Sequence, residues 1–333
     1  MKERPRYRPL GTIIAFAVLS ILFSVSPVQA VPPGEVSWTA EATTALRAVA
    51  AMDPDEKVRG TDTLAIKFVS PAFWHYSAYK PDFDTSQKVI KIWRVGTYYL
   101  VNARTKHTDK TLVEMAAQGL RQVVALGAGF DTRAYRFAHK MPNVRFYEMD
   151  LPATIARKEE TARAVLGKLP ASLFYVPIDF NTQSILERLK AAGYKEDQVT
   201  LFIWEGVTYY ITQAAVEGTL RFVAGHSAPG SAIVFDYVLA DVVRGDFSRY
   251  KDGRFTALRC AFAGEPWLFG FEEGQSQAFV EKCGLQVKSD MGPEDMAKLY
   301  LTRSNGEVDG KPSSFFRLMH AVVPARRGES AAK

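Results

Sequence analysis

The fold of this chain is decided by one stretch, Val123-Val124-Ala125-Leu126-Gly127-Ala128-Gly129-Phe130-Asp131-Thr132-Arg133-Ala134-Tyr135-Arg136-Phe137. A short apolar run ends at Gly-Ala-Gly and a helical pattern begins at once, which predicts a strand, a tight turn and a helix. Glycines let backbone N–H groups approach a ligand closely, and a helix N-terminus favours negative charge. The turn is therefore predicted to cradle the polar atoms of a ligand.

Two details argue against a dinucleotide pyrophosphate in this turn. Thr132 stands where the third glycine of G-x-G-x-x-G would be, and the carboxylate of Asp131 would repel a pyrophosphate. A ligand that carries both a carboxylate and cationic groups fits better, and S-adenosylmethionine is such a ligand. An NAD-dependent oxidoreductase would share the turn and stays open as an alternative.

Short apolar runs recur from Val123 onward and alternate with helical segments. Runs that are apolar on both faces, spaced as in βαβ units, are typical of a parallel sheet. We expect an α/β fold with a doubly wound, mostly parallel sheet of seven strands, whose last two strands pair antiparallel at one edge. The strands are predicted at 123–126, 144–149, 173–178, 200–204, 232–237, 286–289 and 315–323, and the helices at 132–140, 154–167, 183–192 and 213–225.

The first third of the chain has a different pattern. An alanine-rich helix is predicted over 39–52, and further helical pieces over 62–73, 87–103 and 108–118, with no convincing strand before Gln122. We therefore expect an N-terminal helical cap over residues 31–118, a ligand-binding core over 119–325 and a disordered tail over 326–333.

Residues 1–30 resemble an export signal. Basic residues from Lys2 to Arg8 precede an apolar run from Leu10 to Val25, and small residues, Val28 and Ala30, stand at the positions that specify cleavage. The run is shorter than the roughly 20 residues of a spanning helix. We expect a cleaved signal and an exported protein, periplasmic or secreted. An uncleaved membrane anchor and a cytoplasmic protein remain open, and a membrane is a partner only if the segment is uncleaved.

Composition excludes several other classes of protein. The net charge of +6 owes half its value to the first eight residues, and no Lys/Arg stripe with interleaved aromatics suggests nucleic acid. Cys260 and Cys283 could pair after export, but two ordinary thiols are the simpler expectation. The five histidines show no metal-ligand spacing, so no metal is predicted.

Acidic residues end three consecutive predicted strands. In an open α/β sheet, ligands bind at the carboxyl ends of the strands. Asp150 stands where a carboxylate can accept both hydroxyls of a ribose, and Asp179 with Phe180 suits an adenine amino group and ring, while Glu205 ends the fourth strand. Glu148 lies on the same strand face as Asp150 and is an alternative ribose contact.

The stretch that opens at Gln122 resembles the signature of the leucine carboxyl methyltransferase-like family, which includes bacterial S-adenosylmethionine-dependent O-methyltransferases. The resemblance implies a class I methyltransferase-like Rossmann fold and S-adenosyl-L-methionine as cofactor. It also implies a contact for each part of that cofactor. Arg104 would pair with the methionine carboxylate, the turn of Gly127 and Gly129 would line the methionyl part, and Glu205 would bind the amino-acid part. Asp150 would hold the ribose, and Asp179 and Phe180 would hold the adenine. Further matches are Asn102-Ala103-Arg104-Thr105, Phe146-Tyr147-Glu148-Met149-Asp150-Leu151-Pro152, Trp204-Glu205-Gly206-Val207-Thr208-Tyr209-Tyr210 and Gly264-Glu265-Pro266-Trp267.

The methyl acceptor is not readable from the sequence beyond its class. We expect O-methylation of a carboxylate or a hydroxyl on a small-molecule or peptidyl acceptor. A carboxylate needs no general base, whereas a hydroxyl benefits from one. The histidines that could serve are His75, His107 and His320, and the tyrosines that could shape an acceptor pocket are Tyr79, Tyr209 and Tyr210.

No catalytic residue is assigned from the sequence. Because S-adenosylmethionine is made in the cytoplasm, the export-like segment leaves a second alternative, an exported binding protein that keeps the fold without catalysis.

Overall fold

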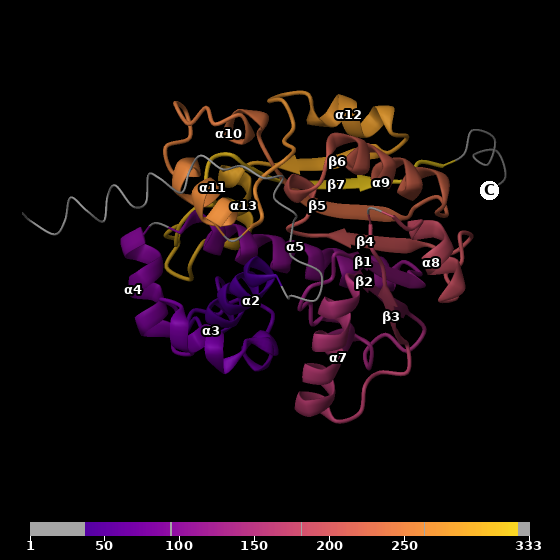
Figure 1. Ribbon diagram of the computed structural model, residues 1–333, viewed down its shortest axis with the longest axis horizontal. Helices are drawn as coiled ribbons and strands as arrows, with labels where there is room; N and C mark the ends of the chain where they lie inside the picture. Colours follow the sequence, from indigo (N-terminus) through magenta and orange to yellow (C-terminus); the bar gives the residue numbers. More distant parts are fainter. Residues whose placement is uncertain (1–36, 94, 181, 263, 326–333) are drawn as a thin grey trace, which may run out of the picture.

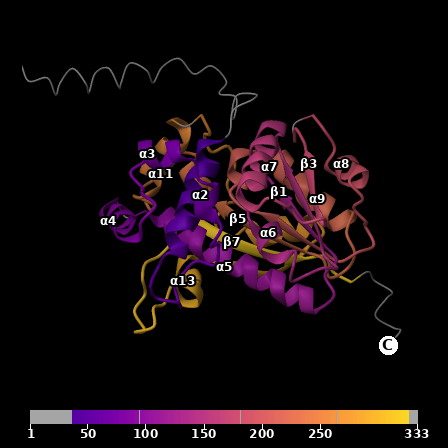
Figure 2. The ribbon, with the colours of Figure 1, turned by 90° about the horizontal axis from the view of Figure 1, so that it is seen from below.

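The computed structural model describes residues 37–93, 95–180, 182–262 and 264–325 (Figure 1). The predicted export segment and the predicted disordered tail lie outside these residues. The described chain forms one sheet with helices packed on both of its faces, as the two perpendicular views show (Figures 1 and 2).

The sheet has seven strands in the order β3-β2-β1-β4-β5-β7-β6. The first five strands of the chain are parallel, and β7 lies antiparallel between β5 and β6. This confirms the doubly wound, mostly parallel sheet and the antiparallel pair at its edge. The strands are β1 (Gln122–Leu126), β2 (Arg145–Asp150), β3 (Leu173–Pro177), β4 (Thr200–Trp204), β5 (Ala232–Val238), β6 (Gln286–Met291) and β7 (Phe316–Val322).

The helices of the core follow the strands as predicted. Pro152 opens α7 at a position where no N–H is needed, and Thr212 caps α9 by accepting a hydrogen bond from the Ala215 N–H at 3.3 Å. Between β1 and β5 the helices are α6 (Arg133–Phe137), α7 (Pro152–Leu166), α8 (Ile185–Ala191), the 3-10 turn η3 (Thr208–Tyr210) and α9 (Gln213–Gly225).

Sequence patterns missed the helices that follow β5. These helices are short, so each contains too few turns to show a clear helical periodicity of apolar residues in the sequence. Packing against the rest of the chain stabilises them. They are α10 (Ala240–Val243), α11 (Gly253–Phe262), α12 (Ser276–Lys282) and α13 (Pro293–Tyr300).

The N-terminal third is helical as predicted, but its helices begin and end elsewhere. The predicted piece at 62–73 is divided at Ser70, which caps the second part, and the piece at 87–103 is divided before Gly96. A Cβ on Gly96 would lie 2.2 Å from Ser313 Oγ. Glycine therefore allows the segment around Ser313, just before β7, to cross the start of α5. The elements are α2 (Trp38–Ala51), η2 (Ala65–Phe68), α3 (Pro71–Tyr76), α4 (Phe83–Trp93) and α5 (Gly96–Ala117).

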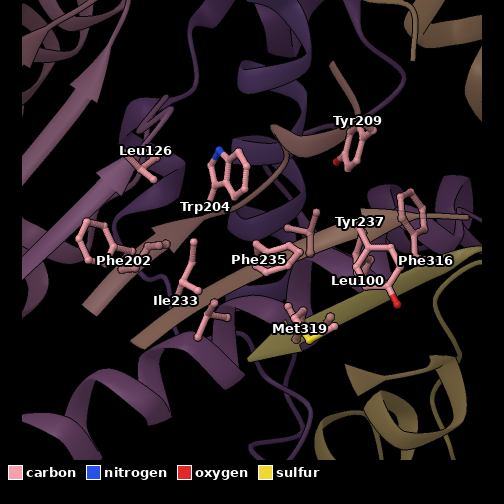
Figure 3. Packing of buried hydrophobic residues seen from close by; sticks show 14 of the residues in the cluster. Leu100, Leu126, Phe202, Trp204, Tyr209, Ile233, Phe235, Tyr237, Phe316 and Met319 are labelled. Carbon is pink, nitrogen blue, oxygen red and sulfur yellow. The ribbon is translucent and has the colours of Figure 1, made fainter. Parts of the chain in front are cut away.

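One hydrophobic core joins these helices to the sheet. Leu100 of α5 packs with side chains of the central strands, and the rings of Trp204 and Phe235 lie 5.8 Å apart (Figure 3). All five residues of β1 and of β4 are buried, as strands covered on both faces must be.

The described residues bear on the sequence expectations for a membrane span, a metal site and a disulfide. Among them, no helix is both long and apolar enough to cross a membrane, and no group of three or more potential metal ligands comes together. Cys260 is half-buried, Cys283 is buried, and both are free thiols.

Candidate active site

The turn after β1 has the geometry that its glycines predict. Gly127 and Gly129 have φ of +69° and +44°, in the left-handed region that favours glycine. A Cβ on Gly127 would lie 2.5 Å from the Cγ2 atom of Val207, so the turn also approaches the chain that follows β4 too closely for any side chain. This turn lies at the carboxyl edge of the sheet.

Asp150 holds that turn from the neighbouring strand. Its Oδ2 atom accepts a hydrogen bond from the Gly129 N–H at 2.7 Å, and its Oδ1 atom accepts one from the Leu151 N–H at 2.7 Å. Burial raises the pKa of Asp150, and these two N–H groups oppose the rise. Asp150 is half-buried at the end of β2, as the sequence predicts.

Glu148 is committed to a different partner. It is buried, and its Oε2 atom lies 2.8 Å from the Nζ atom of Lys158, which projects from α7 and is itself fully buried. Burial raises the pKa of Glu148 to about 7, against the opposing attraction of Lys158. Of the two carboxylates at the end of β2, Asp150 is therefore the one available to a ligand.

Asp179 and Phe180 follow β3 next to Asp150. The Ile178 N–H donates to the Asp150 carbonyl at 2.8 Å, which brings the ends of β2 and β3 together. Both residues are half-buried, and the Asp179 N–H binds the Gln183 side chain at 3.0 Å.

Arg104 and Glu205 meet at the fourth strand end. Arg104 comes from the middle of α5, is only 3% exposed, and places its Nε atom 3.6 Å from Glu205. Its Nη1 atom donates to Asp236 at 2.8 Å, while its buried Nε makes no hydrogen bond within the described chain. A solvated surface role for Arg104 is thereby ruled out.

Sequence reasoning missed several residues of this cluster, Asp236 and Arg133 among them. Asp236 is fully buried in the middle of β5 and also accepts the Gly206 N–H at 2.7 Å. Arg133 donates to Glu205 at 2.9 Å and to Asp109 at 2.7 Å, and it pairs with Asp131. The signal was present, because a lone carboxylate inside the apolar run of β5 requires a cationic partner.

The pairing of Arg133 also corrects one sequence argument. Although burial opposes it, the positive charges of Arg133, Lys158 and Arg47 hold the pKa of Asp131 well below its usual value. The charge of Asp131 is thus compensated, and that residue alone does not exclude a pyrophosphate.

The charge of the whole cluster does favour a cationic ligand. Ion pairs of 2.6 to 3.6 Å, together with the close pair of Arg133 and Asp131, join four arginines and five carboxylates, so the cluster carries a formal excess of one negative charge. S-adenosylmethionine, with an amino group, a sulfonium and one carboxylate, carries one excess positive charge. The members are Arg47, Asp62, Arg104, Asp109, Asp131, Arg133, Arg136, Glu205 and Asp236.

A cavity of about 370 Å³ lies beside this cluster. Tyr209 joins the two, because its ring lines the cavity while its hydroxyl donates to Asp236 at 3.3 Å. The lining comes from α2, the α4–α5 junction, η3, α11 and the start of β7, and it includes all three tyrosines that the sequence singled out, Tyr79, Tyr209 and Tyr210. It is mostly apolar or aromatic, with Asp252 and Arg259 as its charged members.

The candidate histidines do not line this cavity. His75 is exposed on α3, and His107 lies with its ring 5.8 Å from that of His320 and its Nδ1 atom 2.8 Å from the Tyr300 hydroxyl. Burial raises the pKa of Tyr79, Tyr209, Tyr210 and Cys260, so these lining groups keep their protons at neutral pH. The described lining of the cavity therefore offers no histidine, phenolate or thiolate as a general base.

Comparison with known families agrees with this geometry. The family model "Leucine carboxyl methyltransferase" matches residues 40–224, which run from α2 to the end of α9. This chain belongs to the leucine carboxyl methyltransferase family. It is accordingly a methyltransferase, and its cofactor is S-adenosyl-L-methionine.

Two similar curated proteins carry the name "Putative S-adenosyl-L-methionine-dependent methyltransferase". One, YktD of Bacillus subtilis (strain 168), is 28% identical over 225 residues, covering 68% of this chain and 72% of the relative. The other, SCO7813 of Streptomyces coelicolor, is 32% identical over 202 residues, covering 60% of this chain and 69% of the relative.

Solved structures are more distant. An O-methyltransferase family protein from Burkholderia thailandensis is 14% identical with a TM-score of 0.41, over 72% of this chain and 63% of that protein. A protein from Galdieria sulphuraria described as a "putative sarcosine dimethylglycine methyltransferase" is 11% identical with a TM-score of 0.44, over 68% of this chain and 88% of that chain.

Proposed function

We propose that this protein is an S-adenosyl-L-methionine-dependent O-methyltransferase whose acceptor is a carboxylate. The observation that supports it is the cavity beside Tyr209, whose described lining holds the guanidinium of Arg259 and the exposed carboxylate of Asp252 but no histidine. The proposal goes beyond family membership in naming the atom that receives the methyl group.

The residues around the turn suit the cofactor. The Gly127–Gly129 turn offers a cradle that a Cβ would fill, and Asp150 at its side offers carboxylate oxygens for the ribose hydroxyls. Arg104, whose buried Nε has no hydrogen bond to the described residues, would meet the methionine carboxylate, and Glu205 the amino group. Asp179 and Phe180 would hold the adenine.

When bound, the cofactor would supply a methyl group activated on a sulfonium, whose leaving group is a neutral thioether. The protein has to position the acceptor oxygen about 3 Å from that methyl group and to exclude water. The tyrosine and tryptophan rings of the cavity would exclude water. Tyr209 lies between the cavity and the cluster of arginines and carboxylates.

A carboxylate fits the chemistry of the lining better than a hydroxyl does. A carboxylate arrives ionised and loses no proton on methylation, so it needs no base. Arg259 is half-buried on α11, where its guanidinium contacts the Tyr79 hydroxyl and lies 5.8 Å from the centroid of the Phe255 ring. Among the described residues it forms no ion pair with a carboxylate. A guanidinium in this position can bind a carboxylate through paired hydrogen bonds.

Export by residues 1–30 is part of this proposal and rests on the sequence alone. A mature protein whose mass equals that of residues 31–333 would support it. A mass equal to that of the full chain, from Met1, would contradict cleavage.

The proposed acceptor can be tested with methyl-labelled cofactor and the full chain. We expect label to pass to octanoic acid or to a peptide with a free C-terminal carboxylate, and not to octanol. Mild alkali should release that label as methanol, because it cleaves a methyl ester and leaves a methyl ether intact. Label that is stable to alkali would show a hydroxyl acceptor and overturn the proposal.

Arg259→Gln should lower the transfer to carboxylates at least about tenfold, the value of a charged hydrogen bond. Arg254→Gln is the matched control, because Arg254 is exposed on the same helix and does not line the cavity.

A further inference from the structure

Glu265, in the Gly264-Glu265-Pro266-Trp267 stretch after α11, is a buried carboxylate that the proposed function does not use. It is only 6% exposed, and no Lys, Arg or His of the described chain lies within ion-pair distance of it. Burying a carboxylate without a cation is costly, and such groups normally have a partner of opposite charge. The side chain that donates a hydrogen bond to it in the described chain is that of Thr39, which is neutral. A cationic partner for Glu265 therefore has to come from outside the described chain.

Thr39 connects Glu265 to the acceptor cavity. It lines the cavity, and its hydroxyl donates to the Oε2 atom of Glu265. Because that proton is committed, the Ser37 hydroxyl, 2.9 Å away, donates to Thr39 rather than accepting from it. A hydroxyl has one proton and two lone pairs, so Thr39 keeps one acceptor position and no donor for a ligand. The negative charge of Glu265 strengthens this acceptor through the chain of hydrogen bonds.

Thr43 lies one turn further along α2 and also lines the cavity. Its hydroxyl donates to the Ala40 carbonyl at 3.0 Å, so it too can only accept a hydrogen bond from a ligand. Residues four positions apart share one face of a helix. The α2 side of the cavity thus presents two hydroxyl oxygens that need donors, with a buried carboxylate behind one of them. An ammonium group has three N–H donors and a positive charge, and so it matches this set of groups.

The α11 side of the cavity carries the opposite charge. Arg259 lines it, and its guanidinium contacts the Tyr79 hydroxyl and the Phe255 ring, neither of which neutralises its charge. Asp252 also lines the cavity, but it is exposed, so water screens its charge. α2 and α11 lie side by side in both views (Figures 1 and 2). The cavity therefore offers a guanidinium to an anion and two acceptor oxygens to a cation.

We propose that the acceptor is a small amino acid with an apolar body, whose carboxylate is bound by Arg259 and whose ammonium group is bound by Thr39 and Thr43 in front of Glu265. This rests on the proposed carboxylate methylation and narrows its substrate class. An acceptor carboxylate oxygen forms the new bond to the methyl carbon as the bond of that carbon to sulfur breaks, which gives a methyl ester and S-adenosylhomocysteine with no proton transferred. The ammonium group keeps its protons beside Glu265 and has no lone pair, so the methyl group goes to oxygen and not to nitrogen.

The first test measures acceptor binding by calorimetry, with the full chain saturated with S-adenosylhomocysteine. The reference acid is 3-phenylpropanoate. Two matched amino acids add an ammonium group to it, phenylalanine next to the carboxylate and 3-[4-(aminomethyl)phenyl]propanoate at the far end of the ring. The better of these two should bind at least about tenfold more tightly than 3-phenylpropanoate, the value of a charged hydrogen bond. If neither binds more tightly than the reference acid, the ammonium site is refuted.

The second test separates a ligand site from a structural role for Glu265. In Glu265→Gln the ratio of the two affinities, amino acid to reference acid, should fall to about one, and Thr39→Val should lower it as well. Glu273→Gln is the matched control, because Glu273 is exposed and does not line the cavity, and it should keep the ratio of wild type. A Glu265→Gln that melts earlier but keeps that ratio would show that Glu265 only stabilises the start of α2. If Glu265→Gln does not fold, an unchanged ratio in Thr39→Val overturns the site instead.

Methyl transfer from labelled cofactor distinguishes failure of this site from failure of the proposed function. Alkali-labile label formed equally well on 3-phenylpropanoate and on both amino acids would refute the ammonium site and leave carboxylate methylation standing. Label that stays on the amino acid after mild alkali would place the methyl group on nitrogen. If the affinity ratio still depended on Glu265 in that case, the ammonium site would stand as a binding site, and the proposed function would fail.

Discussion

At the scale of single residues, the turn after β1 depends on glycine at position 127 for two separate reasons. Its φ of +69° disfavours any side chain, and a Cβ there would lie 2.5 Å from Val207. The sequence shows the glycine but not the second reason, because Val207 lies 80 positions further on and reaches the turn only through the pairing of β1 with β4.

Gly127→Ala should therefore reduce both stability and binding of S-adenosylhomocysteine. Strain at a positive φ costs of the order of 1–3 kcal/mol, and the clash adds to it. Val207→Ala in the same chain should restore part of the loss, because it removes the clash and leaves the strain. Thermal melts and calorimetry of the three variants check this, and a double variant no better than Gly127→Ala would contradict the contact.

Glu148 is predicted to give the protein an unusual dependence on pH. Its pKa is about 7 in the folded chain, through burial, against a usual value of 4.5. Between these values the folded state holds a proton that the unfolded state has lost. The free energy of unfolding should therefore fall as pH rises from about 4.5 to about 7.

Denaturant titrations of wild type and Glu148→Gln across this range isolate that contribution. The variant has an amide in place of the titrating carboxyl group. Its free energy of unfolding should therefore decline less with rising pH than that of wild type. Parallel pH profiles for the two proteins would show that Glu148 has an ordinary pKa.

At the scale of elements, α5 does most to assemble the site. It brings Arg104 and Thr108, one turn apart, to Glu205, and Thr108 donates to that carboxylate at 2.7 Å. Its start is fixed by Gly96, where the chain near Ser313 crosses. The sequence predicted one helix over 87–103, which joins the end of α4 to the start of α5. The close approach of Ser313 to Gly96 separates them, and contact between residues so far apart leaves no periodic signal in the sequence.

Gly96→Ala and Gly218→Ala form a matched pair that tests this crossing. Both lie in helices, where alanine is usually favoured by about 1 kcal/mol. Gly218 has nothing within 4 Å of a built Cβ, so its replacement should stabilise the protein. Gly96→Ala should instead destabilise it by about 1–3 kcal/mol, the cost of overpacking. Denaturant midpoints measure both, and a Gly96→Ala that stabilises would refute the close approach.

At the scale of the whole molecule, the doubly wound sheet was predictable and the charge balance of the site was not. Alternating apolar runs such as those of β1, β2 and β4, and the turn at Gly127, were enough to predict the sheet and to place Asp150, Asp179 and Glu205 at one edge. Arg133 and Asp109 were missed, because each becomes part of the site only when distant elements meet. Asp236 was overlooked, although a lone carboxylate in the apolar run of β5 was a signal. The acceptor cavity likewise draws on α2, α11 and β7, which no local pattern connects.

The central claim is that this edge binds S-adenosyl-L-methionine through the Gly127 turn and Asp150. Calorimetry of the full chain with S-adenosylhomocysteine tests it most directly, with Asp150→Ala and the exposed control Asp246→Ala beside it, and NAD as the competing ligand. Wild type and Asp246→Ala should bind S-adenosylhomocysteine equally, Asp150→Ala should bind about 10 to 100 times more weakly through loss of charged hydrogen bonds, and NAD should not bind. Equal binding by wild type and Asp150→Ala, or binding of NAD in place of S-adenosylhomocysteine, would contradict the account.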